Sequence, residues 1–176
     1  MREFAAQHEH EIFYGFFLDC NATYFEILGH LNTDVMLHAK AQASKLEHTE
    51  LYKGVMIETL IEDFRWSGGD WGYFQIFDAC GHDETYDRMI EDMIKHFTLT
   101  RRGIDSRIYE DFLDMACRVA ARLERGNAFD GLQRTPNFRV LCADHDESVE
   151  DGERRLQRNR GVSPRRPGAT ADPPRE

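Results

Sequence analysis

The segment ADHDES, residues 143–148, carries the side chains that acid–base chemistry and metal binding use. Asp144, His145, Asp146 and Glu147 place three carboxylates and an imidazole within four positions. Such a cluster can ligate a hard divalent cation, or set a histidine beside a carboxylate as a general base. Neighbouring side chains of a strand point to opposite faces, so a complete site requires further residues from elsewhere in the chain. The pattern alone favours a solvated strand end.

The segment RWSGGDWGY holds both tryptophans of the chain. A four-residue loop between them predicts a hairpin in which Trp66 faces Trp71, because side chains pair across antiparallel strands. Phe64 and Tyr73 would then lie opposite each other on the same face, which gives a clasp of four aromatic rings. We interpret this motif first as a structural clasp. Its second interpretation is the wall of a partner-binding site with Asp70 at the rim.

Other reactive residue types occur without a recognisable catalytic spacing. Cys20, Cys80, Cys117 and Cys142 form no C-x-x-C pair, so we expect reduced, partly buried thiols. The pairing His8-Glu9-His10 lacks the spacing that sets two histidines on one helical face. The chain also has no G-x-S-x-G, G-x-G-x-x-G or P-loop pattern. The sequence therefore assigns no catalytic residue, no metal site and no cofactor.

Charge is distributed unevenly along the chain. The 176 residues carry a formal net charge of −10, and residues 151–176 hold seven arginines against four acidic side chains. Residues 1–150 therefore hold 15 basic and 28 acidic side chains, a net charge of −13. Such a domain repels phosphate backbones, so the acidic part is not expected to bind nucleic acid, whereas a basic protein would be attracted to it.

The N-terminal residues contain no apolar signal core, and no apolar run approaches the roughly 18–20 residues that a membrane-spanning helix needs. We therefore expect a cytoplasmic protein that does not bind membranes.

Strand and helix patterns alternate without a regular rhythm. Strands are expected at residues 11–19, 23–31, 73–77 and 138–142, and helices at about 33–46, 49–64, 83–97 and 105–125. In the first strand, simple alternation predicts one face with Ile12, Tyr14, Phe16 and Leu18 and another with Phe13 and Phe17.

These patterns predict an α+β fold, with a mainly antiparallel sheet packed by several amphipathic helices. We expect one globular domain over residues 1–148. Residues 149–176 are rich in Arg, Pro, Gly and acidic side chains and poor in large apolar ones, which predicts a disordered tail.

Four motifs in order resemble a family of small bacterial proteins known only as a domain of unknown function. These motifs are the FYGFFLD strand, LNTDVML, RWSGGDW and FRVLCADHDES, and they span roughly residues 10–148. The resemblance implies an α+β domain of bacterial origin and brings no established catalytic residues. A further analogy of size, charge and class, to SUKH-type immunity proteins that neutralise toxins, implies a protein-binding role.

We therefore predict a non-catalytic acidic binding protein, immunity-like, that captures a basic protein partner such as a toxin. The residues assigned to partner binding are Trp66, Asp70, Trp71, Tyr73, Asp144, His145 and Glu147. Two alternatives stay open. One is a metal-dependent hydrolase that uses the DHDE strand end, with the tryptophans as a pocket wall. The other is a structural subunit of a larger assembly.

Overall fold

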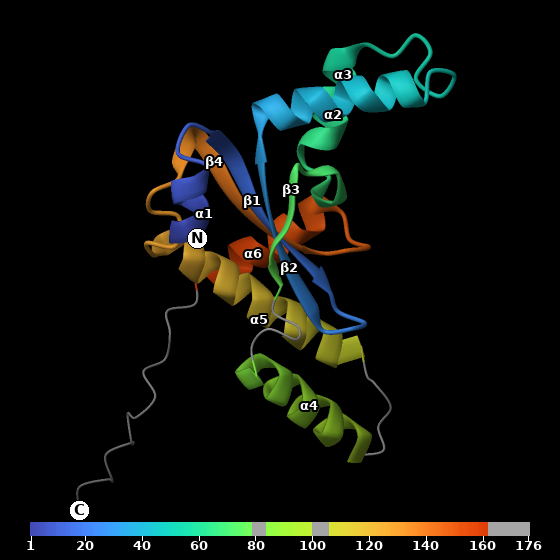
Figure 1. The fold of residues 1–176 in the computed structure, drawn as a ribbon. Helices are drawn as coiled ribbons and strands as arrows, with labels where there is room; N and C mark the ends of the chain where they lie inside the picture. The colour runs from blue at the N-terminus through green and yellow to red at the C-terminus, as the bar shows by residue number, and fades with distance from the viewer. Residues whose placement is uncertain (79–83, 100–105, 162–176) are drawn as a thin grey trace, which may run out of the picture.

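The computed structural model of the 176-residue chain describes residues 1–78, 84–99 and 106–161 (Figure 1). Its elements are α1 (Arg2–Gln7), β1 (Ile12–Asn21), β2 (Glu26–Thr33), α2 (Asp34–Glu47), α3 (Ile57–Arg65), the short 3-10 helix η1 (Gly68–Asp70), β3 (Tyr73–Asp78), α4 (Glu84–Leu99), α5 (Ser106–Arg125), β4 (Gln133–Asp144) and α6 (Val149–Arg160). This content confirms the predicted α+β class. The helix expected from Thr49 begins only at Ile57, after a turn that includes Gly54 at a φ of 79°.

The four strands form one sheet in the order β3-β2-β1-β4. The pairs β1–β2 and β2–β3 are antiparallel, and only β1 and β4 run parallel. The expectation of a mainly antiparallel sheet is therefore confirmed. Because β1 and β4 are parallel neighbours, the ends of both strands lie at the same edge of the sheet, where Cys20 pairs with Asp144.

A bulge in β1 changes which side chains face which side. The register shifts between Phe13 and Gly15 in both pairings of this strand. Before and after this point the alternation is offset by one residue, so Phe13 shares a face with Phe16 while Tyr14 shares the other face with Phe17. The simple alternation predicted from the sequence is wrong here, since it assumed an unbroken pleat.

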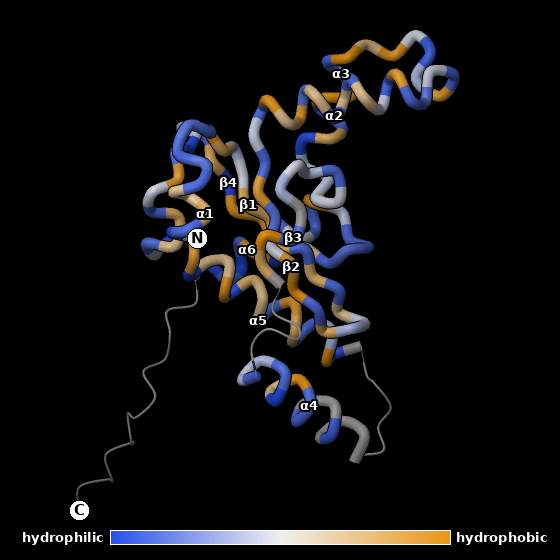
Figure 2. Tube along the Cα trace, in the orientation of Figure 1, coloured by the Kyte–Doolittle hydropathy of each residue, from blue (hydrophilic) through white to orange (hydrophobic). Residues whose placement is uncertain are grey.

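Each face of the sheet has its own apolar core. Helix α5 covers one face with buried side chains that include Ile108 and Phe112 (Figure 1). The opposite face packs against α2, α3 and Trp71. Figure 2 shows hydrophobic stretches along the central strands and along the helices that pack on them. The first strand, β1, is therefore central in the sheet and covered on both sides.

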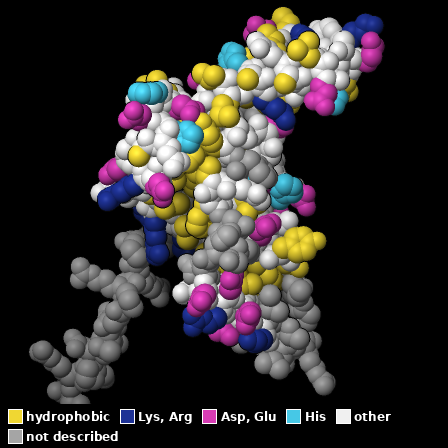
Figure 3. Space-filling view, in the orientation of Figure 1, with side chains coloured by type: hydrophobic (Ala, Val, Ile, Leu, Met, Phe, Trp, Pro, Cys, Tyr) yellow, Lys and Arg dark blue, Asp and Glu magenta, His cyan; other side chains and the backbone are white. Residues whose placement is uncertain are grey.

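Helices α2 and α3 form an arm that projects from one end of the sheet (Figure 1). Helix α2 begins where the Thr33 hydroxyl accepts a hydrogen bond from the backbone N–H of Met36, as expected of an N-cap. The arm exposes large apolar side chains to solvent (Figure 3), namely Val35, Leu46, Leu51 and Met56. Its inward side chains, Leu37, Ala41, Leu60 and Ile61, are buried in the core on the face of the sheet opposite α5.

The predicted domain boundary at residue 149 is wrong, because residues 149–160 form helix α6 rather than a disordered tail. The Ser148 hydroxyl caps this helix by accepting from the N–H of Asp151. Leu156 is only 1% exposed, and Asn159 Nδ2 donates to Asp114 Oδ1 at 2.9 Å. The helix docks largely through polar side chains, which a search for apolar patterning does not detect. The rest of the predicted tail, residues 162–176, lies outside the described residues.

Three of the four cysteines are fully buried, more deeply than the partly buried thiols that the sequence predicts. Cys20, Cys117 and Cys142 are free, and the sulfurs of Cys20 and Cys142 lie 3.8 Å apart. Cys80 lies outside the described residues.

Candidate functional site

A pocket of about 310 Å³ lies where the turn after α3 meets the end of β4. It is named the His145 pocket here and is lined by Phe17, Asp19, Trp66, Ser67, Gly68, Gly69, Asp144, His145, Glu147 and Val149. Two motifs that the sequence suggested separately, the tryptophan segment and the DHDE strand end, therefore meet in one place. Of the seven predicted site residues, four line this pocket: Trp66, Asp144, His145 and Glu147.

Asp19 is the residue of this pocket that sequence reasoning missed. It is 5% exposed, and its Oδ2 lies 3.1 Å from Nδ1 of His145 and 3.6 Å from Nε2 of His30. A carboxylate in the run FFLDC, among strand residues covered on both faces, was the available signal. The first strand was expected to end at Asp19, whereas β1 continues to Asn21 and places this carboxylate within the sheet.

His30 supports Asp19 from inside the protein. Its side chain is fully buried, and its Nδ1 accepts a hydrogen bond of 2.9 Å from the backbone N–H of Gln75. An Nδ1 that accepts carries no proton, so neutral His30 carries its proton on Nε2, toward Asp19. Gln75 has a φ of 51° and lies where the β2–β3 register shifts, so this irregularity contributes the hydrogen bond that orients the imidazole.

The contact between Asp19 and His145 shifts the pKa values of both side chains. Burial raises the pKa of the Asp19 carboxyl, but its contacts with His30 and His145 and the charge of His145 outweigh that effect, and the net shift is downward. The hydrogen bond to Asp19 raises the pKa of His145, and the charges of Asp19, Asp146 and Asp144 add to that rise. The side chain of His145 is 58% exposed while that of Asp19 is 6% exposed. The buried carboxylate of Asp19 therefore orients the imidazole of His145, which is exposed to solvent.

Asp144 and Glu147 are engaged in building the turn. The two oxygens of Asp144 accept from the backbone N–H groups of Ala22 and Asp146, each at 3.2 Å. Glu147 accepts from the N–H of Asp144 at 3.2 Å and forms an ion pair with the buried Arg155. Their roles in the pocket are therefore to shape it and to set its charge.

The tryptophans do not form the predicted hairpin. Trp66 ends helix α3, and η1 connects it to Trp71, so Phe64 lies on a helix rather than on a strand. The two indole rings still contact each other, with centroids 6.3 Å apart at 52°. The predicted hairpin is wrong because α3 continues to Arg65, so the segment before the turn is a helix and not a strand. The turn itself contains the three-residue helix η1.

Only one of the two tryptophans lines the pocket. Trp71 is 3% exposed, and its Nε1 donates to the carbonyl of Arg65 at 3.1 Å. Trp66 carries the guanidinium of Arg139 at 4.6 Å from its ring centroid. Trp71 is thus a core residue, while Trp66 forms part of the wall of the His145 pocket.

Asp70 and Tyr73 also lie away from the pocket lining. Asp70 accepts a hydrogen bond of 2.9 Å from the Ser67 hydroxyl and forms an ion pair of 3.1 Å with Lys40. These contacts stabilise the turn that contains η1. Tyr73 packs with the core on the α5 side, where its hydroxyl lies 3.0 Å from Nδ1 of His8 and bonds Glu11. Neither residue therefore lines the His145 pocket.

Gly68 allows the turn to approach β1. A Cβ at this position would lie 2.1 Å from the ring of Phe17, closer than any real contact. Gly69 has nothing within 4 Å of its equivalent position. The glycine pair thus has one residue required by close packing and one that faces open space.

Among the residues that the structure describes, no group of three or more His, Cys, Asp or Glu side chains is arranged to hold a metal ion. Within the same residues, no helix is long and apolar enough to cross a membrane. The chain matches no protein-family model, and the searches of curated proteins and of solved structures found no significant similarity.

Proposed function

We propose that this protein is a non-catalytic acidic binding protein that captures a basic segment of a protein partner at the His145 pocket. The observation that carries the proposal is the acidic turn at one wall of this pocket. Asp144, Asp146 and Glu147 follow one another there around His145, and Asp146 is exposed. An immunity-like role, with a basic toxin as the partner, is the form of this function that the charge favours.

The ordered C-terminal helix changes the charge of the domain only modestly. Residues 1–161 carry 19 basic and 30 acidic side chains, a net charge of −11. The arginines of α6 are largely paired, with Arg155 on Glu147 and Glu110 and Arg160 on Glu124. The domain thus stays strongly acidic, and its net charge would steer a basic partner toward the protein.

Affinity capture from bacterial lysate, followed by a salt titration of the captured partner, tests this function. Binding should weaken steeply between about 0.1 M and 1 M salt, where the Debye length falls from about 10 Å to about 3 Å. The double variant Asp146→Asn, Glu150→Gln removes two exposed charges beside the pocket and should weaken binding.

A matched control gives the protein the same net charge as the test variant. Glu58→Gln with Glu62→Gln removes two exposed charges from α3 instead and should bind as the unmodified chain does. Equal losses in both double variants would show that net charge alone acts, and unchanged binding in both would reject the His145 pocket as the interface.

A second candidate function is supported by the Asp19–His145 contact. A histidine held by a buried carboxylate is the arrangement of a general base, which takes a proton from an attacking water. We propose this as the alternative, a hydrolase at the same strand end. Ester and phosphodiester substrates, assayed with and without added divalent cations, test it. Any activity must fall on His145→Ala and on Asp19→Asn, and activity unaffected by both rejects the candidate.

A further inference from the structure

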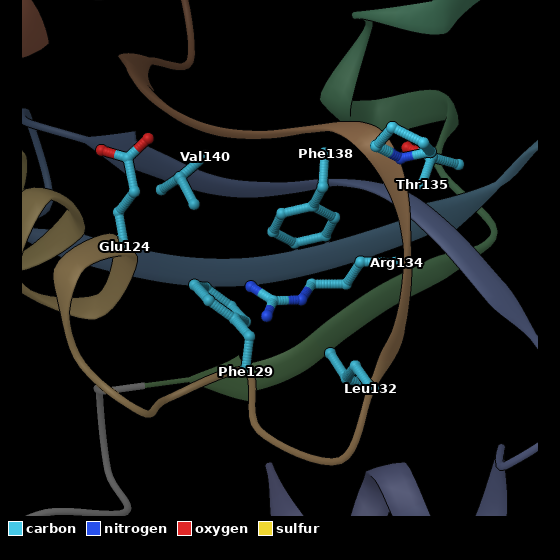
Figure 4. Close-up of a pocket in the computed structure, with 8 residues that line it drawn as sticks. Glu124, Phe129, Leu132, Arg134, Thr135, Phe138 and Val140 are labelled. Carbon is cyan, nitrogen blue, oxygen red and sulfur yellow. The ribbon is translucent and has the colours of Figure 1, made fainter.

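A second pocket, of about 470 Å³, lies on the α5 side of the sheet and shares no residue with the His145 pocket. It is named the Arg134 pocket here. Figure 4 shows the residues that line it, which are Glu124, Phe129, Leu132, Arg134, Thr135, Pro136, Phe138 and Val140. Its volume falls within the range of pockets that hold small organic molecules, roughly 300–1,000 Å³.

The irregular start of β4 opens this pocket. Arg134 pairs with Phe13 of β1, but the next paired residue of β4 is Arg139, opposite Gly15. Four residues of β4 therefore lie across from one residue of β1, and residues 135–138 bulge out of the sheet. Phe138 lies in this bulge, and its ring meets that of Phe129 at a centroid distance of 5.3 Å. These two rings form an apolar wall.

Arg134 contributes a cation to that wall. Its guanidinium carbon lies 5.5 Å from the centroid of the Phe138 ring, and Figure 4 shows the group beside the rings of Phe129 and Phe138. Arg134 forms no ion pair with any described residue. A guanidinium that stacks through its face keeps the N–H donors along its edge available, in the fork that matches a carboxylate.

The one carboxylate of the pocket is already neutralised. Glu124 accepts two hydrogen bonds from Arg160, one of 2.7 Å from Nη2 and one of 2.8 Å from Nε. The charge that remains without an internal partner in this pocket is therefore positive, although the protein as a whole is acidic.

We propose that the Arg134 pocket binds a small organic anion with a planar, apolar body. Its carboxylate, or an equivalent oxyanion, accepts hydrogen bonds from the edge of the Arg134 guanidinium. Its apolar body packs on Phe129 and Phe138 and against Leu132 and Val140 at the base. This binding site is independent of the function proposed for the His145 pocket.

Two probes of the same shape test this assignment, 1-naphthoate and the neutral 1-naphthamide. Each is titrated into the full-length protein while the NMR signals of the Leu132 and Val140 methyl groups are followed. Both residues are buried in the pocket lining, so their signals report occupancy. Naphthoate should bind at least about tenfold more tightly than naphthamide, the factor expected for one charge-assisted pair.

Arg134→Gln should remove this preference and leave the two probes with equal affinity. Arg134 is exposed, so the variant should fold normally. Arg154→Gln is the control, because Arg154 is an exposed arginine on α6 that pairs with Asp151. It should keep the full preference. Equal binding of both probes to the unmodified protein, or a preference that survives Arg134→Gln, would overturn the proposal. Methyl signals that do not move would overturn it as well.

Discussion

The imidazole of His145 and the carboxylate of Asp19 lie 3.1 Å apart although 126 positions separate them in the chain. The contact depends on the parallel pairing of β1 with β4, which brings the ends of two distant strands together. It joins an exposed group to a buried one, and the protonation of the first depends on the charge of the second.

Replacing Asp19 by Asn should lower the pKa of His145. The hydrogen bond and the charge of Asp19 are the largest causes of its upward shift from 6.5, and a neutral amide removes the charge. Titration of the His145 imidazole by NMR measures the effect. Asp146→Asn is the control: it removes a smaller contribution and should lower the pKa less. Equal decreases in the two variants would contradict a specific role of Asp19.

The stability of the protein should depend on the protonation of His145. Its folded-state pKa is raised, so its contribution to stability is present in full below pH 6.5, the unfolded value, and is lost as pH rises through the folded value. Urea denaturation from pH 6 upward should show this loss, and His145→Asn should abolish it. A loss of the same size in His145→Asn would assign the pH dependence to another group.

Gly68→Ala should destabilise the protein by about 1–3 kcal/mol, the usual cost of forcing extra atoms into packed space. The new methyl group would collide with the ring of Phe17, at 2.1 Å. Gly69→Ala is the matched control, since its Cβ would meet nothing within 4 Å. Chemical denaturation measures both free energies of unfolding. A Gly69→Ala variant that loses as much stability would refute the close approach of turn and strand.

Leu156→Ala should destabilise the protein by about 2–5 kcal/mol, as expected for a buried leucine. Leu156 is 1% exposed, whereas Leu46 on the projecting arm is 80% exposed. The same substitution at Leu46 should change the free energy of unfolding by less than about 0.5 kcal/mol. If the two variants unfold alike, α6 is not docked on the core.

Tyr14→Phe should cost about 1–3 kcal/mol, because it leaves buried groups without partners. The Tyr14 hydroxyl donates to the carbonyl of Arg65 and accepts from Nδ2 of Asn32, each at 2.9 Å. Tyr24→Phe, at a residue 73% exposed, should leave the free energy of unfolding unchanged. This comparison measures how strongly β1 holds the end of α3 beside the pocket, and an equal response at both tyrosines would deny that link.

Local patterns were sufficient to predict most elements of the fold. The apolar spacing from Ile108 to Leu123 predicted α5, and the aromatic run after Glu11 predicted β1. Helix α6 was missed because its inward side includes Arg155 and Asn159, whose burial depends on partners in distant segments. Composition describes such a helix as a solvated segment.

The candidate site was predicted in part. His145 and Trp66 were identified by residue type, and both line the pocket. Asp19 could not be placed, since its role depends on a strand pairing between residues 126 positions apart. The tryptophan hairpin was wrong because four residues between the tryptophans fit either a hairpin loop or a turn after a helix. Helix α3 occupies the segment that the first strand of the hairpin required.

The bulge at Phe13–Gly15 determines which face of the sheet each later residue of β1 occupies. Phe17 and Asp19 face the pocket because the offset occurs before them, while Cys20 faces the thiol of Cys142 on the other side. Removing one residue from the bulge would exchange the two faces of the strand. A carboxylate would then enter the apolar core, and a thiol would take its place beside His145. The bulge thus determines which side chains of β1 face the His145 pocket, although it lies several residues before the first of them.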